Sequence, residues 1–156
     1  MYDIHLRDET VADDNFLRGL YASTRGGEMS LLPWTDAEKS IFLNQQFNLQ
    51  RRHYRQHFPD AEFMLVLLAG QAVGRWYVQR GADAYLLIDV ALLPAHRGQG
   101  LGGFLMNRLL SDAANAKKPV RLHVEKHNRA QNLYTRLGFD PINDEGVYLL
   151  MEWRPG

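Results

Sequence analysis

The sequence contains no cysteine among its 156 residues. Without cysteine the chain can form no disulfide bond, carries no thiolate nucleophile and offers no cysteine ligand for zinc. It also lacks any apolar run that approaches the ~20 residues of a membrane span, and no basic start followed by an apolar stretch indicates a targeting segment. These absences predict a cytoplasmic protein with no membrane-spanning segment.

The chain has no excess of charge of either sign. Eighteen lysine and arginine residues balance eighteen aspartate and glutamate residues, so no overall field draws the protein to nucleic acid or to an anionic membrane. The basic segment 51–57 is a local exception, and such a run is more often the solvated face of a helix. The length and the 46% hydrophobic content favour one domain over residues 1–156.

Residues 85–109 predict a strand, a glycine-rich loop and a helix, in that order. The loop reads Arg97, Gly98, Gln99, Gly100, Leu101, Gly102. After it, Leu101, Leu105 and Leu109 recur every four residues, as the core-facing stripe of a helix does. This order leaves unpaired backbone N–H groups at a helix N-terminus, which is a site for anions. The glycines let a phosphate approach the backbone, and Arg97 adds a guanidinium. We therefore expect a phosphorylated cofactor at the loop.

A dinucleotide is one candidate for that cofactor, because residues 98–103 match the pattern G-x-G-x-x-G. Dinucleotide folds also need an acidic residue about 20 residues further on, for the ribose hydroxyls. Here residues 116–119 read Ala-Lys-Lys-Pro. A nucleotide- or dinucleotide-binding protein is therefore the least favoured of three hypotheses.

The loop resembles the pyrophosphate loop of the GNAT superfamily of acetyl-CoA-dependent N-acetyltransferases, whose pattern is Arg/Gln-x-x-Gly-x-Gly/Ala. A second segment, residues 128–139, is similar to a later helix of that family, which carries a tyrosine and ends in Leu-Gly-Phe. The resemblance implies an α+β (α/β/α) fold, in which helices flank a mixed, mostly antiparallel sheet of about 6–7 strands.

The same resemblance assigns roles to single residues. Acetyl-CoA is the implied co-substrate, with no metal, and the implied cofactor-binding residues are Leu92, Leu93, Arg97, Gly98, Gln99, Gly100, Leu101, Gly102 and Asn128. Tyr134 matches the tyrosine that lies beside the sulfur as a general acid, and a tyrosine packed in the core is the alternative. His123 stands where some relatives carry a carboxylate base, and Glu125 is the reserve. Leu86 replaces the catalytic glutamate of histone-acetylating members, so we do not expect a histone-type mechanism.

The chemistry of acetyl transfer agrees with these residue types. An amine with a pKa of about 10.4 is only about 0.04% neutral at pH 7, so a base near pKa 6.5 is useful, and histidine is the natural type. A tyrosine phenol, with a pKa of about 10, can protonate a leaving thiolate whose thiol has a pKa near 8.5. His123 has an equal alternative as a structural or surface histidine.

Other patterns predict the remaining elements. Thr10-x-x-Asp13 and Thr35-x-x-Glu38 are typical of helix starts, and residues 23–30 between them read as a loop. A hairpin is expected over 63–78, and strands over 120–125 and 147–153. Loops at 25–34 and 143–146 are expected to line the acceptor site. Glu28 there is either the partner of a substrate amine or, more often for such a residue, a solvated side chain.

These observations favour an N-acetyltransferase that moves an acetyl group from acetyl-CoA directly to a primary amine in a ternary complex. The partner would be a small-molecule or peptide amine, with no nucleic acid and no membrane, and the resemblance is compatible with a homodimer. A catalytically silent acyl-CoA-binding or sensing module is the alternative.

Overall fold

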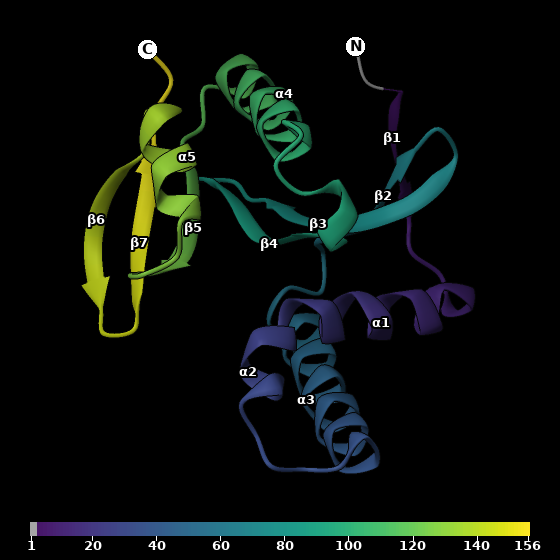
Figure 1. Ribbon diagram of the computed structural model, residues 1–156. Coiled ribbons are helices and arrows are strands. Elements are labelled where there is room, and N and C mark those ends of the chain that lie inside the picture. Colours follow the sequence, from purple (N-terminus) through teal and green to yellow (C-terminus); the bar gives the residue numbers. More distant parts are fainter. Residues whose placement is uncertain (1–2) are drawn as a thin grey trace. The chain divides into compact units, whose positions relative to one another are not determined.

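A computed structural model describes residues 3–156 (Figure 1). Its strands are β1 (Ile4–Asp8), β2 (Glu62–Leu68), β3 (Gln71–Arg80), β4 (Tyr85–Leu92), β5 (Val120–Glu125), β6 (Asp140–Glu145) and β7 (Tyr148–Trp153). Its helices are α1 (Asp14–Thr24), α2 (Gly26–Ser30), α3 (Asp36–His57), α4 (Leu101–Ala116) and α5 (Ala130–Arg136), with 3-10 turns η1 (Val11–Asp13) and η2 (Pro94–His96).

The strands form one seven-stranded sheet in the order β1-β2-β3-β4-β5-β7-β6. Strands β4 and β5 pair in parallel, whereas β1 with β2, β5 with β7 and β6 with β7 pair antiparallel. This mixed sheet with helices confirms the predicted α+β class. Within the described residues, none of the helices is both long and apolar enough to cross a membrane.

Contacts group the chain into two compact units, which we describe in turn. The first unit comprises the chain up to Trp76 together with Val90–Arg97, and the second comprises Tyr77–Asp89 together with Gly98–Gly156.

Helix starts in the first unit are set by the two predicted capping boxes. The Asp13 carboxylate accepts one hydrogen bond from the Thr10 N–H at 2.8 Å and two from the terminal nitrogens of Arg7, each at 2.9 Å. The Thr35 hydroxyl accepts the Glu38 N–H at 3.1 Å, and the Glu38 carboxylate accepts the Thr35 N–H at 3.0 Å. Each box satisfies N–H groups that a helix start leaves unpaired, which confirms both predictions.

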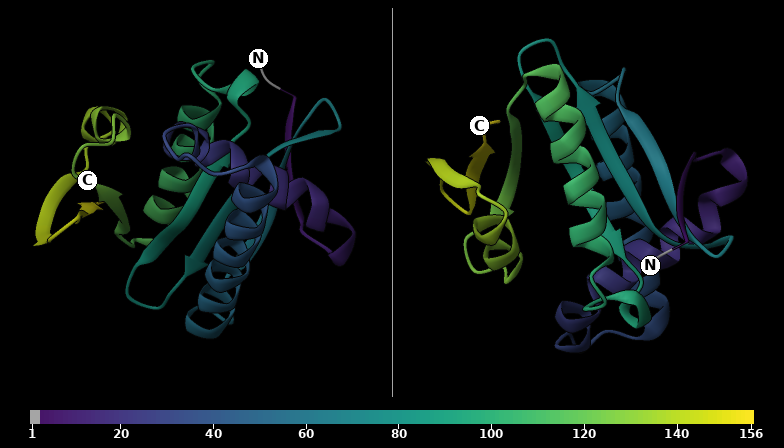
Figure 2. Two further views of the ribbon diagram at one scale, coloured as in Figure 1. Left: turned by 60° about the horizontal axis from the view of Figure 1, so that its bottom comes forward. Right: turned by 90° about the horizontal axis from the view of Figure 1, so that it is seen from above.

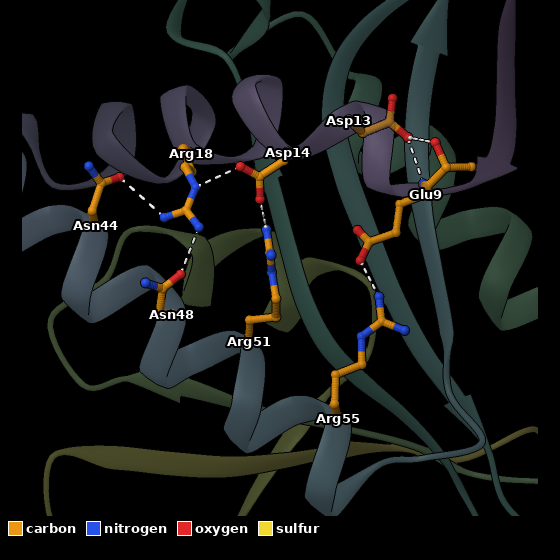
Figure 3. Close-up of polar contacts among 9 residues, drawn as sticks. Glu9, Asp13, Asp14, Arg18, Asn44, Asn48, Arg51 and Arg55 are labelled. Atoms are coloured by element: carbon orange, nitrogen blue, oxygen red, sulfur yellow. Dashed lines mark hydrogen bonds and ion pairs between the residues drawn. The ribbon is translucent and has the colours of Figure 1, made fainter.

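Helices α1 and α3 pack together through an apolar core and a row of ion pairs. The core holds Leu17, Tyr21, Phe47 and Leu65. Beside it, Asp14 accepts hydrogen bonds from Arg18 at 2.8 Å and from Arg51 at 2.5 Å, while Glu9 pairs with Arg55 at 2.5 Å (Figure 3). Much of the positive charge of segment 51–57 is therefore neutralised inside this unit, in agreement with its interpretation as a helix face.

The prediction of a loop over 23–30 is wrong, because α1 continues to Thr24 and α2 occupies Gly26–Ser30. The hydroxyls of Ser23 and Thr24 bond back to the carbonyls of Leu20 and Tyr21 at 2.6 and 2.7 Å. Such bonds let these residues stay helical. Burial of the Met29 side chain then holds α2 despite its two glycines.

The second unit confirms two predicted patterns and corrects a third. Leu101, Leu105 and Leu109 of α4 are buried, and the side chains of β5 alternate between buried and more exposed positions. Figure 2 shows α5 next to β5, β7 and β6 in both views. The loop expected at 143–146 is wrong, since β6 runs to Glu145 and pairs with β7 through an irregularity between Pro141 and Asn143. Its polar sequence carries no strand pattern, so pairing with β7 decides its conformation.

Candidate functional site

The glycine-rich loop has the backbone geometry that its sequence predicts. Gly98 and Gly100 have φ angles of +71° and +81°, a left-handed conformation that glycine adopts at little cost. Gly100 is the N-cap of α4, and in the described part of the chain no side chain caps this end. The first helical bond joins the Phe104 N–H to the Gly100 carbonyl at 3.0 Å. The N–H groups of residues 101–103, in the first turn of α4, have no carbonyl partner within the helix, and such groups can bind an anion.

The first turn of α4 leaves room for such an anion. Among the atoms of residues 3–156, a Cβ added to Gly102 would meet none within 4 Å, and one added to Gly103 would meet the Leu133 side chain alone, at 4.0 Å. No described atom of the protein therefore requires glycine at position 102, and the space beside it is open to a ligand.

The end of β4 is engaged by contacts within the first unit. Leu93 donates its N–H to the Val73 carbonyl at 2.8 Å and accepts the His96 N–H at 2.9 Å. The Leu92 carbonyl accepts the Nε–H of Arg97 at 2.9 Å. Of the two leucines predicted to hold a cofactor, Leu93 thus uses both backbone groups within the protein, whereas Leu92 uses its carbonyl for Arg97. Leu92 is therefore the better candidate, through its N–H group.

Strands β4 and β5 pair only over the start of each strand. Within residues 3–156 the ladder joins Tyr85 to Val120, Leu86 to Arg121 and Leu87 to Leu122, and β4 then continues to Leu92. The rest of β5, from His123 to Glu125, keeps its pairing with β7. The described pairing of these two parallel strands is therefore confined to residues 85–87 of β4 and 120–122 of β5.

Tyr134 is a buried side chain of α5, with 8% of its surface exposed. Its ring packs against Phe139 at a centroid distance of 5.8 Å. Burial raises the pKa of the Tyr134 phenol, and the negative charge of Asp89 on β4 raises it further. The phenol therefore remains protonated at neutral pH, as a proton donor must.

His123 lies on the exposed face of β5. Its Nε2 is 3.1 Å from Oε1 of Glu145 on β6, and both side chains are partly exposed. The pairing of Val120 with Trp153 puts Trp153 on the buried face of β5, and a Cβ on Gly138, at the end of α5, would lie 3.3 Å from its ring. Since α5 covers this buried face, Tyr134 and His123 come from opposite faces of β5.

Asn128 lies directly before Arg129, the N-cap residue of α5. Its side-chain oxygen accepts the Ala130 N–H at 2.8 Å, so its NH2 group is the part that can donate to a ligand. Glu28 forms an ion pair with Arg25 at 2.9 Å, and its side chain is mostly exposed. This agrees with its interpretation as a solvated side chain.

Two neighbours of the candidate residues were missed from the sequence. Glu145 was missed because β6 was not predicted. Gly74 on β3, where an added Cβ would lie 2.7 Å from a methyl group of Leu92, was missed because a single glycine in a strand carries no signal of its contacts. In the range 3–156 no group of three or more histidine and acidic residues could hold a metal ion.

Comparison of the sequence with models of known families shows to which family the chain belongs. A family model described as acetyltransferase (GNAT) domain matches residues 59–141, which is more than half of the chain. The chain belongs to the GNAT family of acetyltransferases. Its match includes the glycine-rich loop and Tyr134. The comparison with curated proteins gives no match.

Solved structures agree with the GNAT fold over nearly the whole chain. The crystal structure of PaiA N-acetyltransferase from Thermoplasma acidophilum in complex with coenzyme A has a TM-score of 0.71 and 16% identity, and the match covers 97% of this chain and 99% of that chain. An acetyltransferase from Thermus thermophilus has a TM-score of 0.70 and 20% identity, with 100% of both chains covered. At these identities the likeness establishes the fold.

Proposed function

We propose that this GNAT protein is an N-acetyltransferase that moves an acetyl group from acetyl-CoA directly to a primary amine in a ternary complex. The observation that carries the proposal is the loop before α4, where Gly98 and Gly100 hold left-handed conformations and no described side chain caps the helix. A diphosphate fits such a site because backbone N–H groups and the helix dipole both favour negative charge.

The residues present fit coenzyme A. Backbone groups of residues 98–102 would bind the pyrophosphate, with the Arg97 guanidinium beside it. The backbone of Leu92 and the side-chain NH2 of Asn128 would contact the pantetheine arm. The complex of a structural relative with coenzyme A supports the same assignment. When bound, acetyl-CoA supplies an acetyl group activated as a thioester.

The transfer itself needs three proton movements. The neutral amine nitrogen attacks the thioester carbonyl carbon, a C–N bond forms, and the C–S bond then breaks. Tyr134 donates its phenolic proton to the leaving sulfur, and the raised pKa of this phenol keeps the proton available. Before the attack, His123 accepts one proton from the ammonium form of the substrate, directly or through water, and Glu125 is the reserve base. After the C–S bond breaks, the amide nitrogen returns its extra proton to the Tyr134 phenolate.

Turnover with a panel of amines tests this proposal. The purified protein is mixed with acetyl-CoA and a polyamine, a free amino acid, a peptide with a free N-terminus or a lysine side chain, and released thiol and acetylated product are both measured. We expect thiol release that depends on one class of amine. Tight binding of acetyl-CoA without transfer to any amine would instead identify a silent acyl-CoA-binding module.

A further inference from the structure

The C-terminal end of β4 is held from the β3 side by unusually close packing. A Cβ atom on Gly74 of β3 would lie 2.3 Å from the Ala91 carbonyl oxygen and 2.7 Å from a methyl group of Leu92. Real side chains do not tolerate contacts this short, so only glycine permits this approach of the two strands. The Leu93 N–H donates a hydrogen bond to the Val73 carbonyl at 2.8 Å, and this bond also holds the end of β4 against β3.

Arg97 holds the end of β4 from the other side. Backbone groups of successive residues in a strand point in opposite directions. Because the Leu93 N–H points to β3, the Leu92 carbonyl points away from β3, and there it accepts the Arg97 Nε–H at 2.9 Å. A guanidinium that uses Nε in this way keeps its terminal nitrogens for other acceptors.

This bond gives Arg97 a role that does not depend on phosphate. We propose that Arg97 is a positioning residue, whose Nε–H fixes the Leu92 carbonyl and thereby the strand end along which the pantetheine arm of the donor lies. The inference rests on the proposed function, because that function places the arm at Leu92. It adds a contact with the strand end to the contact that Arg97 would make with phosphate.

Two substitutions separate the hydrogen bond of Arg97 from its charge. In Arg97→Gln the amide nitrogen stands the same number of bonds from Cα as Nε does, so the donor is kept and the charge is lost. In Arg97→Lys a methylene group occupies that place, so the charge is kept and the donor is displaced. A residue that only attracts phosphate would be harmed more by Gln than by Lys.

The first measurement uses two acetyl donors, acetyl-CoA and S-acetylpantetheine, which carries no phosphate. With S-acetylpantetheine we expect kcat/KM of Arg97→Gln to stay within about twofold of the wild type, and that of Arg97→Lys to fall by roughly tenfold, because small displacements of a bound substrate slow its reaction. If both variants match the wild type with this donor, Arg97 acts on phosphate alone and the inference is overturned.

The second measurement needs no activity. Amide hydrogen exchange at Leu93 in the ligand-free protein reports how firmly the strand end is held. We expect exchange in Arg97→Lys to be roughly tenfold faster than in the wild type and in Arg97→Gln; equal rates in all three proteins would overturn the inference, even if S-acetylpantetheine proves too poor a donor to use. Absence of acetyl-CoA binding by the wild type would count against the proposed function and leave the exchange result to decide the hydrogen bond.

Discussion

The Tyr134 side chain is buried and feels the negative charge of Asp89, and both features keep its phenol protonated. The apolar surroundings and the nearby Asp89 both disfavour the phenolate, so the pKa of Tyr134 lies above its ordinary value. A phenol of this kind stays protonated across the physiological pH range. Its ring also packs against Phe139, at a centroid distance of 5.8 Å.

We expect Tyr134→Phe to lower kcat by roughly 100-fold, as loss of a general acid does. Affinity for CoA and the free energy of unfolding should change little, because phenylalanine keeps the ring contact with Phe139. Steady-state kinetics together with thermal unfolding measure this. Tyr148→Phe, at an exposed tyrosine of β7, is the matched control and should leave kcat unchanged. Equal kcat in both variants would make Tyr134 a packing residue.

His123 has a partner that no local pattern predicted, the Glu145 carboxylate at 3.1 Å. This contact restrains the ring at the exposed face of β5. Such a restraint is compatible with a catalytic base and with a surface histidine, so a measurement of the activity of a His123 variant is needed to distinguish them.

For a base that acts on the amine, the effect of substitution depends on pH. We expect His123→Asn to lower kcat/KM by about 100-fold at neutral pH, and the loss to shrink as the pH approaches about 10.4, where a lysine-like amine loses its proton unaided. The raised pKa of Tyr134 leaves the acid intact over much of this range. The pH profile of kcat/KM for both proteins provides the test, with Glu125→Gln as the control for the reserve base. A deficit that is constant with pH would rule out the base role.

At the scale of single elements, two glycines at the start of α4 differ in why glycine suits them. Gly100 has a backbone conformation that favours glycine, whereas Gly102 only leaves open space. Gly100 has a φ of +81° at the N-cap, whereas Gly102 lies in the first helical turn with open space around its Cα. The two glycines should therefore respond to alanine in opposite directions.

We expect Gly100→Ala to lower the free energy of unfolding by about 1 kcal/mol, because alanine is strained in the left-handed region. Gly102→Ala should raise it by about 0.5 kcal/mol, because alanine has the higher helix propensity. Denaturant unfolding measures both, and CoA affinity should survive in Gly102→Ala, since the family pattern accepts alanine there. A loss of stability in Gly102→Ala would contradict the open space in the structure.

The start of α1 makes a second prediction at this scale. Hydrogen bonds from Arg7 and from the Thr10 N–H lower the pKa of Asp13 to about 2. Because this pKa is below the value in the unfolded chain, the carboxylate stabilises the fold above about pH 4, and that contribution is lost as the pH falls toward 2.

We expect Asp13→Asn to cost about 1–2 kcal/mol of unfolding free energy at neutral pH. The difference from the wild type should narrow between about pH 4 and pH 2, as Asp13 takes up its proton. Urea unfolding at several pH values gives both quantities. If the difference persists unchanged at the lowest pH where the wild type is folded, the ionised carboxylate is not its source.

For the whole molecule, the sequence predicted what local patterns determine. The capping boxes at Thr10 and Thr35, the leucine stripe of α4 and the alternation in β5 each depend on residues close together in the chain, and each was confirmed. Helix α2 and strand β6 depend on burial of Met29 and on pairing with β7. Those contacts join distant residues, so no local pattern could reveal them.

The candidate site divides in the same way. The glycines of the loop could be predicted because a phosphate-binding turn needs a fixed spacing of small residues. The bond from Arg97 to Leu92, the close approach of Gly74 to Ala91 and the pairing of His123 with Glu145 could not, because each depends on side-chain direction after folding. The family was recognisable from the two motifs, whereas the acceptor amine has no comparable signature in the sequence.

The central claim is that the loop before α4 holds acetyl-CoA, and calorimetric titration of the wild-type protein with acetyl-CoA, CoA and NAD in parallel tests it most directly. We predict binding of acetyl-CoA and CoA with dissociation constants of roughly 1–100 μM and no heat of binding with NAD. Binding of NAD without binding of acetyl-CoA would contradict the account and every role assigned above that depends on the acetyl donor.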